Sequence, residues 1–359
     1  MRKAKVLLGL SGGVDSSVAA LILKNEGYQV DAIFMRNWED DDGSPYCSIK
    51  EDFIDAAFVA DQIKIDLNKV NFSKEYKDKV FSYFLKELEL GRTPNPDILC
   101  NREIKFDSFF NYAMKNGYDF ISTGHYVRNK ISNKSTYLLK GKDSKKDQSY
   151  FLHSVREEAL AKSIFPLGKL TKTEVRRIAK KEGLITSEKK DSTGICFIGE
   201  RSFPKFLSNY LSHNPGKILD EHGTEIGEHK GLPFYTLGQR QGLGIGGLKD
   251  SNNYPWYVAN KDLISNTLIV VQGNYHPLLM SKELDTKNLE LVNTLKKAKF
   301  SGKAKVRYKQ DDQDCEIEVI NNKLKVRFAK PQRAVTPGQS VVIYQNEICL
   351  GGGEIQNIF

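Results

Sequence analysis

The feature that most constrains this chain is a glycine- and serine-rich loop that follows its first apolar stretch. The loop reads Ser11-Gly12-Gly13-Val14-Asp15-Ser16-Ser17. It lies between an apolar run, Lys5–Leu10, and a segment with helical periodicity, Ser16–Glu26. Glycines let the backbone approach an anion closely, and the N–H groups of a helix's first turn favour negative charge. The loop therefore predicts a phosphate-binding turn between a strand and a helix.

Two common nucleotide-binding loops do not match this string. The chain has no GxxxxGK[ST] string, and no GxGxxG string follows its first strand, so both of these loops are excluded. An ordinary turn with a serine or aspartate helix cap is the simpler alternative. Asp15 is unusual beside phosphates unless it holds a divalent cation, which would reverse its electrostatic effect.

The order of strand-like and helix-like patterns indicates an α/β fold for the first part of the chain. Expected strands are Lys5–Leu10, Val30–Phe34, Asp66–Val70 and Asp119–Thr123. Expected helices are Ser16–Glu26, Ile49–Ile63, Lys74–Leu90 and Ile104–Met114. Strands that alternate with helices favour a parallel sheet with its ligand at the carboxyl ends of the strands.

The texture of the sequence changes near residue 202. Short alternating strands separated by turn residues follow, including Lys303–Tyr308, Glu316–Ile320, Leu324–Phe328 and Val341–Tyr344. Regular short strands of this kind predict two small β-barrels or sandwiches. We therefore expect an α/β protein with a parallel-sheet domain at residues 1–200, a β-rich domain at 201–278 and a barrel-like domain at 279–359.

Composition narrows the choice of partners and compartment. The chain carries 54 Lys and Arg against 45 Asp and Glu, a net charge of +9. This excess suits a polyanion such as a nucleic acid, although a well-solvated surface gives the same count. No apolar run reaches the length of about 18 residues that a membrane helix needs. We expect a cytoplasmic protein without a membrane partner.

The five cysteines form no CxxC pair, so neither a zinc ribbon nor an iron–sulfur site is predicted, and no metal-ligating residues are assigned. Cys100 follows the double-proline segment Thr93–Leu99 and precedes a helical pattern, a place that can lower a thiol pKa. Cys196 lies in the glycine-flanked segment Asp191–Gly199. Taken alone, both could be small buried hydrophobic residues. Cys47 is expected to be incidental, and the strand cysteines Cys315 and Cys349 structural.

The phosphate loop resembles that of the PP-loop ATP pyrophosphatases, which cleave ATP to AMP and pyrophosphate while adenylating a substrate. Six further strings resemble the tRNA-specific 2-thiouridylase family within that group. They are Met35–Trp38, Thr93–Asn101, Thr123–Tyr126, Gly141–Tyr150, Asp191–Gly199 and Tyr235–Arg240. The resemblance implies ATP and Mg²⁺ as cofactors. It also implies that ATP is bound by Gly9, Leu10, Ser11, Gly12, Gly13, Val14, Asp15, Ser16, Met35 and Gly124.

The same resemblance implies a sulfur-transfer mechanism. The 2-oxygen of a uridine at the tRNA wobble position would be adenylated, which makes AMP the leaving group. Cys196 would carry a persulfide from a donor protein, and Cys100 would then form a disulfide with Cys196 that a cellular thiol reductant reopens. Release of hydrosulfide by Cys100 is an open alternative. Asp97, three residues before Cys100, would act as general acid or base.

The resemblance further implies contacts with the anticodon region of tRNA. The implied residues are Asn95, Pro96, Asp97, His125, Lys146, Asp147, Gln148, Arg307, Tyr308 and Gln339. Trp38 and Tyr126 could stack on bases or pack in the core. Two rival functions remain open. A synthetase for a small metabolite would need neither cysteine, and a noncatalytic RNA-binding protein would have no use for an intact loop.

Overall fold

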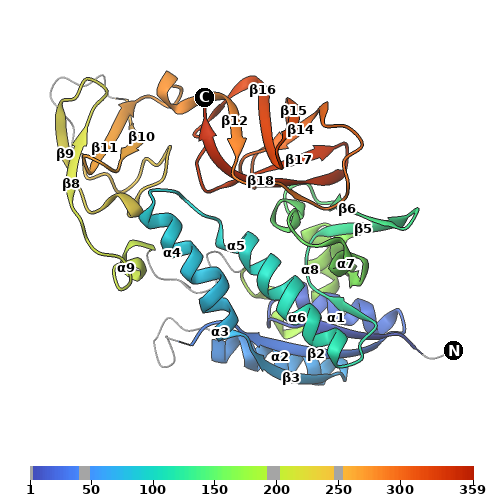
Figure 1. Ribbon diagram of the computed structural model, residues 1–359. Helices are drawn as coiled ribbons and strands as arrows, with labels where there is room; N and C mark the ends of the chain where they lie inside the picture. Colours follow the sequence, from blue (N-terminus) through green and yellow to red (C-terminus); the bar gives the residue numbers. More distant parts are fainter. Residues whose placement is uncertain (1–2, 40–48, 192–202, 246–253) are drawn as a thin grey trace.

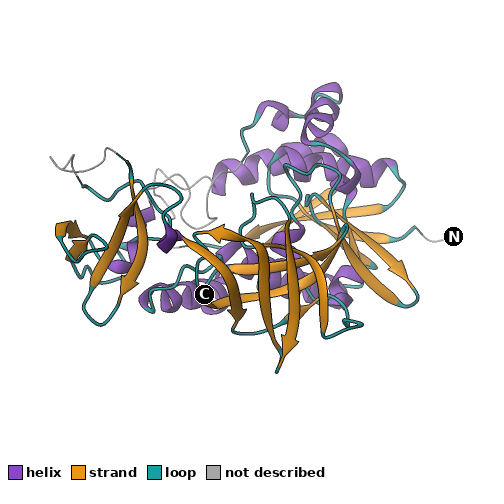
Figure 2. Ribbon diagram, turned by 90° about the horizontal axis from the view of Figure 1, so that it is seen from above, coloured by secondary structure: helices purple, strands orange, loops and turns teal. Residues whose placement is uncertain are grey.

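The computed structural model describes residues 3–39, 49–191, 203–245 and 254–359. Its strands form three sheets of five, four and nine strands, and Figure 2 shows the four-stranded sheet apart from the other two. Within these described ranges, no helix is long and apolar enough to cross a membrane. The predictions for Cys47 and Cys196 concern positions outside the described residues. The predicted fold class, a parallel α/β domain followed by β-rich domains, is confirmed.

The N-terminal sheet is parallel throughout, in the order β3-β2-β1-β4-β7. Its strands are β1 (Lys5–Gly9), β2 (Gln29–Arg36), β3 (Asp66–Asn71), β4 (Phe120–Ser122) and β7 (Ser163–Ile164). Leu7 packs into one hydrophobic core, and its neighbours Val6 and Leu8 pack into the other. Because successive side chains of a strand point to opposite faces, the sheet is buried on both sides.

Helices cover the two faces of this sheet (Figure 1). One face packs against α1 (Val14–Asn25), α2 (Ile49–Ile63) and α8 (Lys172–Lys181). The other packs against α3 (Ser73–Tyr76), η1 (Lys77–Phe81), α4 (Ser82–Glu89), η2 (Cys100–Ser108) and α6 (Phe109–Lys115). Short helices complete the domain: α7 (Glu157–Ala161), η3 (Ser149–Leu152), η4 (Pro166–Lys169) and η5 (Ile185–Glu188).

The helix around Cys100 begins earlier than the sequence pattern predicted. The predicted start was Ile104, but α5 (Pro96–Leu99) runs directly into η2 and α6. Asn95 caps this helix by accepting hydrogen bonds from the amides of Asp97 (3.1 Å) and Ile98 (3.3 Å), and Pro96 fills its first position. Cys100 therefore lies inside a helix, one turn after its start, and not ahead of one.

The central β-rich region forms a four-stranded sheet in the order β10-β11-β8-β9. Its elements are α9 (Phe203–Leu207), β8 (Gly216–Leu219), β9 (Glu225–His229), η6 (Leu232–Phe234), β10 (Trp256–Asp262) and β11 (Thr267–Gln272). The pair β8–β11 is parallel, and the other two pairs are antiparallel.

The C-terminal strands close into an antiparallel barrel. The ring runs β12-β16-β15-β14-β17-β18 and closes where β18 pairs with β12. Its elements are η7 (Pro277–Leu279), β12 (Met280–Thr286), β13 (Glu290–Leu291), β14 (Lys299–Lys305), β15 (Gln313–Ile320), β16 (Lys323–Arg333), β17 (Ser340–Gln345) and β18 (Ile348–Ile358). Closure removes the free strand edges that an open sheet would expose.

Strand β14 differs from the predicted strand Lys303–Tyr308. It ends at Lys305, and the next residues turn, because the amide of Val306 donates to the side chain of Gln310 (2.8 Å). Arg307 and Tyr308 therefore lie in a turn of the barrel and not on a strand.

A hairpin of the N-terminal domain joins the barrel wall. It consists of β5 (Val127–Ser132) and β6 (Ser135–Lys140), and β6 pairs with β18 at Leu138↔Cys349. Figure 1 shows this hairpin between the barrel and the parallel-sheet domain. The N-terminal domain and the barrel are thus connected by main-chain hydrogen bonds.

Candidate active site

The predicted phosphate loop lies at the carboxyl edge of the parallel sheet, between β1 and α1. The amide of Leu10 donates to the carbonyl of Ile33 (2.9 Å), which holds the loop against β2. Gly12 has φ +73°, and a Cβ there would lie 2.1 Å from the carbonyl oxygen of Asp52. Gly13 precedes α1 without any side-chain cap. The amides of the first turn are therefore available to an anion.

Serine hydroxyls fix the shape of this loop. Ser16 and Ser17 both donate to the carbonyl of Gly13, at 3.0 and 2.9 Å. The Ser16 hydroxyl also accepts from the amide of Ser11 (3.2 Å). Ser16 and Ser17 are buried, whereas Ser11 is exposed. Of the three, Ser11 is the residue whose hydroxyl is accessible to a bound phosphate.

Glycines also let the predicted nucleotide residues approach one another. A Cβ at Gly9 would lie 2.9 Å from the Cε of Met35, and a Cβ at Gly124 would lie 3.0 Å from the amide nitrogen of Ser16. The structure thus brings Gly9, Met35 and Gly124 together around the loop. Their contact with ATP stays a prediction.

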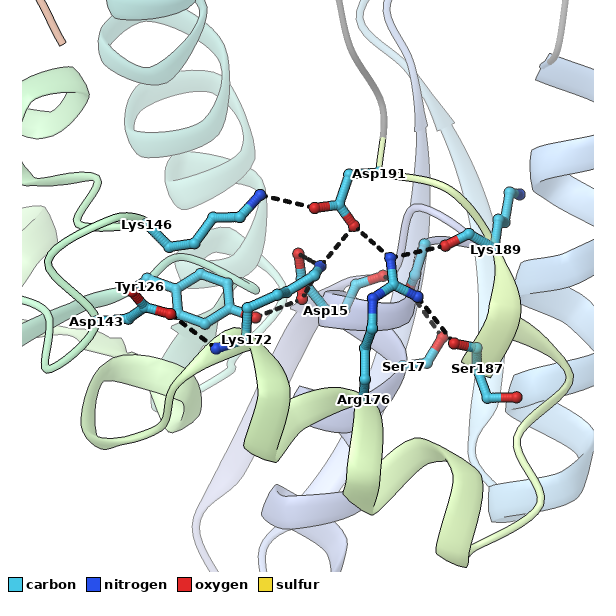
Figure 3. A network of polar contacts seen from close by, with 12 residues as sticks. Asp15, Ser17, Tyr126, Asp143, Lys146, Lys172, Arg176, Ser187, Lys189 and Asp191 are labelled. Carbon is cyan, nitrogen blue, oxygen red and sulfur yellow. Dashed lines mark hydrogen bonds and ion pairs between the residues drawn. The ribbon is translucent and has the colours of Figure 1, made fainter. Parts of the chain in front are cut away.

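Asp15 is held by two side chains that come from outside the loop (Figure 3). Its carboxylate accepts a hydrogen bond from the hydroxyl of Tyr126 (2.6 Å) and pairs with the ammonium of Lys172 (2.7 Å). Tyr126 is buried, and so is Trp38. The alternative that these two aromatic residues pack in the core is therefore the correct one in this structure.

A second carboxylate, Asp191, extends this polar network. It pairs with Lys172 (2.8 Å), Arg176 (2.7 Å) and Lys146 (2.7 Å). Partial burial raises the pKa of Asp191, but the hydrogen bonds and charges of Lys146 and Lys172 outweigh it and lower that pKa to about 2. Asp191 is ionised at neutral pH. The sequence patterns did not predict Lys172, Arg176 or Asp191 as site residues.

Cys100 and Asp97 lie on the same helix, three residues apart and hence on one face. Cys100 is 2% exposed and packs in the hydrophobic core, while Asp97 is half-buried. Burial raises the pKa of the Asp97 carboxyl, and the positive charge of Lys105 opposes this rise. A carboxyl with a raised pKa next to a thiol is suited to proton transfer.

His125 lies at the carboxyl end of β4 and faces the Cys100 helix. Its Nδ1 is 2.8 Å from the hydroxyl of Thr123, and its ring is 5.8 Å from that of Phe106. Burial, and then the charge of Lys105, lowers the pKa of His125 well below its ordinary value. His125 is therefore neutral at neutral pH. Lys105, which the sequence patterns did not single out, acts electrostatically on both His125 and Asp97.

The predicted tRNA-binding residues around position 147 stabilise their own loop. Asp147 is buried, and its carboxylate accepts from the amide of Gly141 (3.0 Å) and the hydroxyl of Ser149 (2.9 Å). Gln148 accepts from the amide of Tyr126 (2.9 Å), and Lys146 pairs with Asp191. Their contact with RNA stays a prediction.

The predicted tRNA-binding residues that lie in the barrel connect it to the other domains. Arg307 donates to the carbonyls of Leu237 (3.1 Å) and Ala334 (2.9 Å), and the ring of Tyr308 is 4.4 Å from that of Phe151. Gln339 donates to the carbonyl of Thr93 (2.7 Å), just before the Cys100 helix. These residues lie at domain junctions, and their contact with RNA likewise stays a prediction.

Two buried cysteines of the barrel agree with the structural role expected of them. Cys315 in β15 packs in the barrel core and is 6% exposed, whereas Cys349 in β18 packs in the core shared with the N-terminal domain and is 0% exposed. Burial raises the pKa of the Cys315 thiol to about 12 and that of Cys349 further still. Neither thiol is a thiolate at neutral pH, so neither is a ready nucleophile.

Comparisons with known proteins cover nearly the whole chain. Residues 4–200 match the family model described as "tRNA methyl transferase HUP domain". Residues 204–272 match "tRNA methyl transferase PRC-barrel domain", and residues 281–355 match "Aminomethyltransferase beta-barrel domain". Among solved structures, a 4-thiouridine synthetase–RNA complex with bound ATP is 20% identical with a TM-score of 0.35. The match covers 57% of this chain and 49% of that chain.

Curated proteins match at a much higher level. The protein "tRNA-specific 2-thiouridylase MnmA" of Pseudomonas entomophila (strain L48) is 56% identical over 355 residues, covering 99% of this chain and 95% of its own. The protein of the same name from Marinobacter nauticus (strain ATCC 700491 / DSM 11845 / VT8) is 56% identical over 356 residues, covering 98% of this chain and 91% of its own. The chain belongs to the family of the tRNA-specific 2-thiouridylases.

Proposed function

We propose that this chain is an ATP-dependent tRNA-uridine 2-sulfurtransferase, which converts the wobble uridine of tRNA in the cytoplasm to 2-thiouridine with release of AMP and pyrophosphate. The observation that carries this proposal is full-length identity of 56% to proteins named tRNA-specific 2-thiouridylase. The phosphate loop with its uncapped α1 and the Cys100–Asp97 helix supply groups that such a reaction needs.

ATP binds at the loop, residues Gly9–Ser16. The first turn of α1 and the Ser11 hydroxyl hold its phosphates, and Met35 and Gly124 line the nucleotide. The Asp15 carboxylate would hold Mg²⁺, because this ion is usually bound by one or two carboxylates together with substrate phosphates and water. Bound there, Mg²⁺ would neutralise charge that develops during the reaction.

Activation of the base precedes sulfur transfer. The 2-oxygen of uracil attacks the α-phosphorus of ATP, the bond to pyrophosphate breaks, and AMP becomes the leaving group on carbon 2. Because Cys100 is buried, the uridine must leave the anticodon stack and enter the protein to reach it. Asp97, whose carboxyl has a raised pKa, exchanges a proton at this centre.

Sulfur arrives on Cys196 as a persulfide from a donor protein. Its terminal sulfur attacks carbon 2 and displaces AMP. The Cys100 thiolate attacks the inner sulfur of Cys196, which frees the terminal sulfur and leaves a Cys100–Cys196 disulfide. A cellular thiol reductant supplies two electrons to reopen it. In the alternative order, Cys100 releases hydrosulfide first, and the hydrosulfide attacks the activated base.

The N-terminal domain and the barrel hold the tRNA. We infer three units, residues 1–200, 201–278 and 279–359, a division supported by the ranges of the three family matches. The anticodon region contacts residues from the first and the third unit. They are Asn95, Pro96, Asp97, His125, Lys146, Asp147, Gln148, Arg307, Tyr308 and Gln339.

The test is mass spectrometry of nucleosides from tRNA incubated with the protein, ATP, Mg²⁺ and a persulfide donor. Wild type is expected to form 2-thiouridine, and Cys100→Ser to lose it. Cys315→Ser, a second buried cysteine in a barrel strand, is the matched control and keeps the activity. With free sulfide, a Cys196→Ser variant that stays active would limit that residue to sulfur delivery.

Three further outcomes would point to rival functions. ATP cleavage that needs no tRNA and forms no thiolated base would indicate a synthetase for a small metabolite. tRNA binding without any pyrophosphate release would indicate a noncatalytic RNA-binding protein. A methylated nucleoside in place of a thiolated one would favour the transferase named in the family model.

A further inference from the structure

The ammonium of Lys172 lies between two carboxylates (Figure 3). It is 2.7 and 2.8 Å from the two oxygens of Asp15 and 2.8 Å from one oxygen of Asp191. The Lys172 side chain is 13% exposed, so water screens these contacts only partly. Asp15 belongs to the phosphate loop, whereas Asp191 lies outside it.

The two carboxylates depend on Lys172 to different degrees. Asp191 has two further cationic partners, Arg176 and Lys146. Asp15 has the hydroxyl of Tyr126, which is neutral, and in the described part of the chain Lys172 is the only cation within ion-pair distance of it. The charge of Lys172 is therefore needed at Asp15 and is largely redundant at Asp191.

The backbone of Lys172 is firmly held, so only its side chain is free to move. Thr171 caps α8 with a reciprocal capping box that involves Glu174. The amide of Lys172 donates to the carboxylate of Asp143 (2.9 Å). Rotation about the side-chain bonds is enough to move the ammonium away from Asp15, and α8 need not shift.

A divalent cation and Lys172 compete for the same place. Lys172 contacts both oxygens of Asp15, so a metal ion bound to that carboxylate would lie beside the ammonium unless Lys172 moved away. Like charges repel strongly where screening by water is weak. A triphosphate at the loop changes this balance, because it brings several negative charges that can hold both cations.

We propose that Lys172 is the resting counter-ion of Asp15 and is exchanged for the divalent cation when the metal–nucleotide complex binds. The Lys172 ammonium then forms ion pairs with the nucleotide phosphates while it keeps its contact with Asp191. Lys172 thus excludes free divalent cations from the empty loop and favours the metal–nucleotide complex. This inference rests on the proposed function, since it takes ATP as the ligand of the loop.

The exchange predicts two effects of opposite sign when the Lys172 charge is removed. In Lys172→Met, Asp15 loses its counter-ion, and nucleotide-free protein is expected to bind Mn²⁺ about tenfold more tightly than wild type. The same variant lacks a phosphate ligand, and its affinity for Mg·ATP is expected to fall about tenfold. If Lys172 only supported the fold, the substitution would weaken both Mn²⁺ binding and Mg·ATP binding or leave both unchanged.

The experiment measures Mn²⁺ binding by electron paramagnetic resonance and Mg·ATP binding by calorimetry, both without tRNA. Lys172→Arg keeps the charge and is expected to exclude Mn²⁺ as wild type does. Arg177→Met removes an exposed cation from the same helix and is expected to match wild type in both measurements. Asp15→Asn is expected to abolish the added Mn²⁺ binding when combined with Lys172→Met.

The outcomes separate this inference from the function on which it rests. Wild type that binds Mg·ATP, together with a folded Lys172→Met whose Mn²⁺ affinity does not rise, overturns the exchange alone. Mn²⁺ binding that rises equally in Arg177→Met also overturns it, because the effect would then come from the loss of any positive charge and not from the position of Lys172. Wild type that binds no Mg·ATP overturns both the exchange and the proposed use of ATP.

Discussion

Gly124 lies against the first turn of α1, so that a Cβ at its position would be 3.1 Å from the carbonyl carbon of Asp15. The atoms in the way belong to the backbone of the phosphate loop, which cannot rotate aside as a side chain can. The segment after β4 can therefore lie this close to the phosphate loop only because Gly124 has no side chain.

This contact predicts the effect of Gly124→Ala. The added methyl group is expected to displace the start of α1 and to lower ATP affinity about tenfold, or about 1.4 kcal/mol. Calorimetric titration with Mg·ATP measures it. Gly227→Ala, where the nearest atom to the new Cβ would be 3.7 Å away, is the matched control and should bind normally. Unchanged affinity in Gly124→Ala would show that the loop adapts freely.

Asn95 has a structural role that is separable from its predicted contact with the base. Asn95→Ala removes the cap of the Cys100 helix, and the free energy of unfolding is expected to fall by about 1 kcal/mol. Asn95→Asp retains a side-chain acceptor and should keep wild-type stability in urea unfolding. If Asn95→Asp is stable but forms less 2-thiouridine, the amide also contacts the substrate. Full activity in Asn95→Asp would leave capping as its role.

Arg307 connects the barrel to the central sheet, so its loss should affect stability as well as RNA binding. Arg307→Ala leaves the carbonyls of Leu237 and Ala334 without this donor, at an expected cost of about 2 kcal/mol in the free energy of unfolding. Urea unfolding and tRNA filter binding are measured together. Lys309→Ala removes an exposed charge from the same turn and should keep its stability. A stable Arg307→Ala with weakened tRNA binding would contradict the structural role.

His153 makes stability depend on pH. Burial lowers its pKa from 6.5 to about 4, against the opposing effect of its hydrogen bond to the carbonyl of Tyr150. Between these values the unfolded chain binds a proton that the folded chain does not, so acid favours unfolding. The free energy of unfolding is expected to fall by up to about 3 kcal/mol as pH drops through this window, and not above it.

Urea unfolding of wild type and His153→Gln at neutral and mildly acidic pH checks this expectation. The variant should lose less stability on acidification than wild type does. His125, which is also buried with a lowered pKa, contributes to both curves and so cancels in the comparison. Parallel curves for the two proteins would exclude a buried neutral His153.

The N-terminal sheet was predictable because local patterns define it. Expected strands such as Lys5–Leu10 and Val30–Phe34 match β1 and β2 within a few residues, since apolar runs bounded by turn residues are visible in the sequence. The start of the Cys100 helix was missed because the apolar period begins only at Ile104. Its true start is marked by a different signal, the asparagine cap followed by proline.

The ion-pair network around Asp15 could not be predicted from the sequence. Lys172 and Asp191 meet Asp15 only after the chain has folded, and nothing in their own surroundings distinguishes them from solvated surface charges. The capping box at Thr171 was a readable signal for the start of α8, but it does not reveal where the Lys172 side chain points. Contacts between distant segments depend on the fold and not on local pattern.

The pairing of β6 with β18 has a consequence for synthesis. Strand β18 also completes the barrel by pairing with β12 and β17. One segment near the C-terminus therefore supplies hydrogen-bond partners to strands of two domains. Until the ribosome has released it, the β5–β6 hairpin has an open hydrogen-bonding edge, and so does the unfinished barrel. The N-terminal domain therefore emerges first but is finished last, and a nascent chain that stalls before β18 exposes both edges to aggregation.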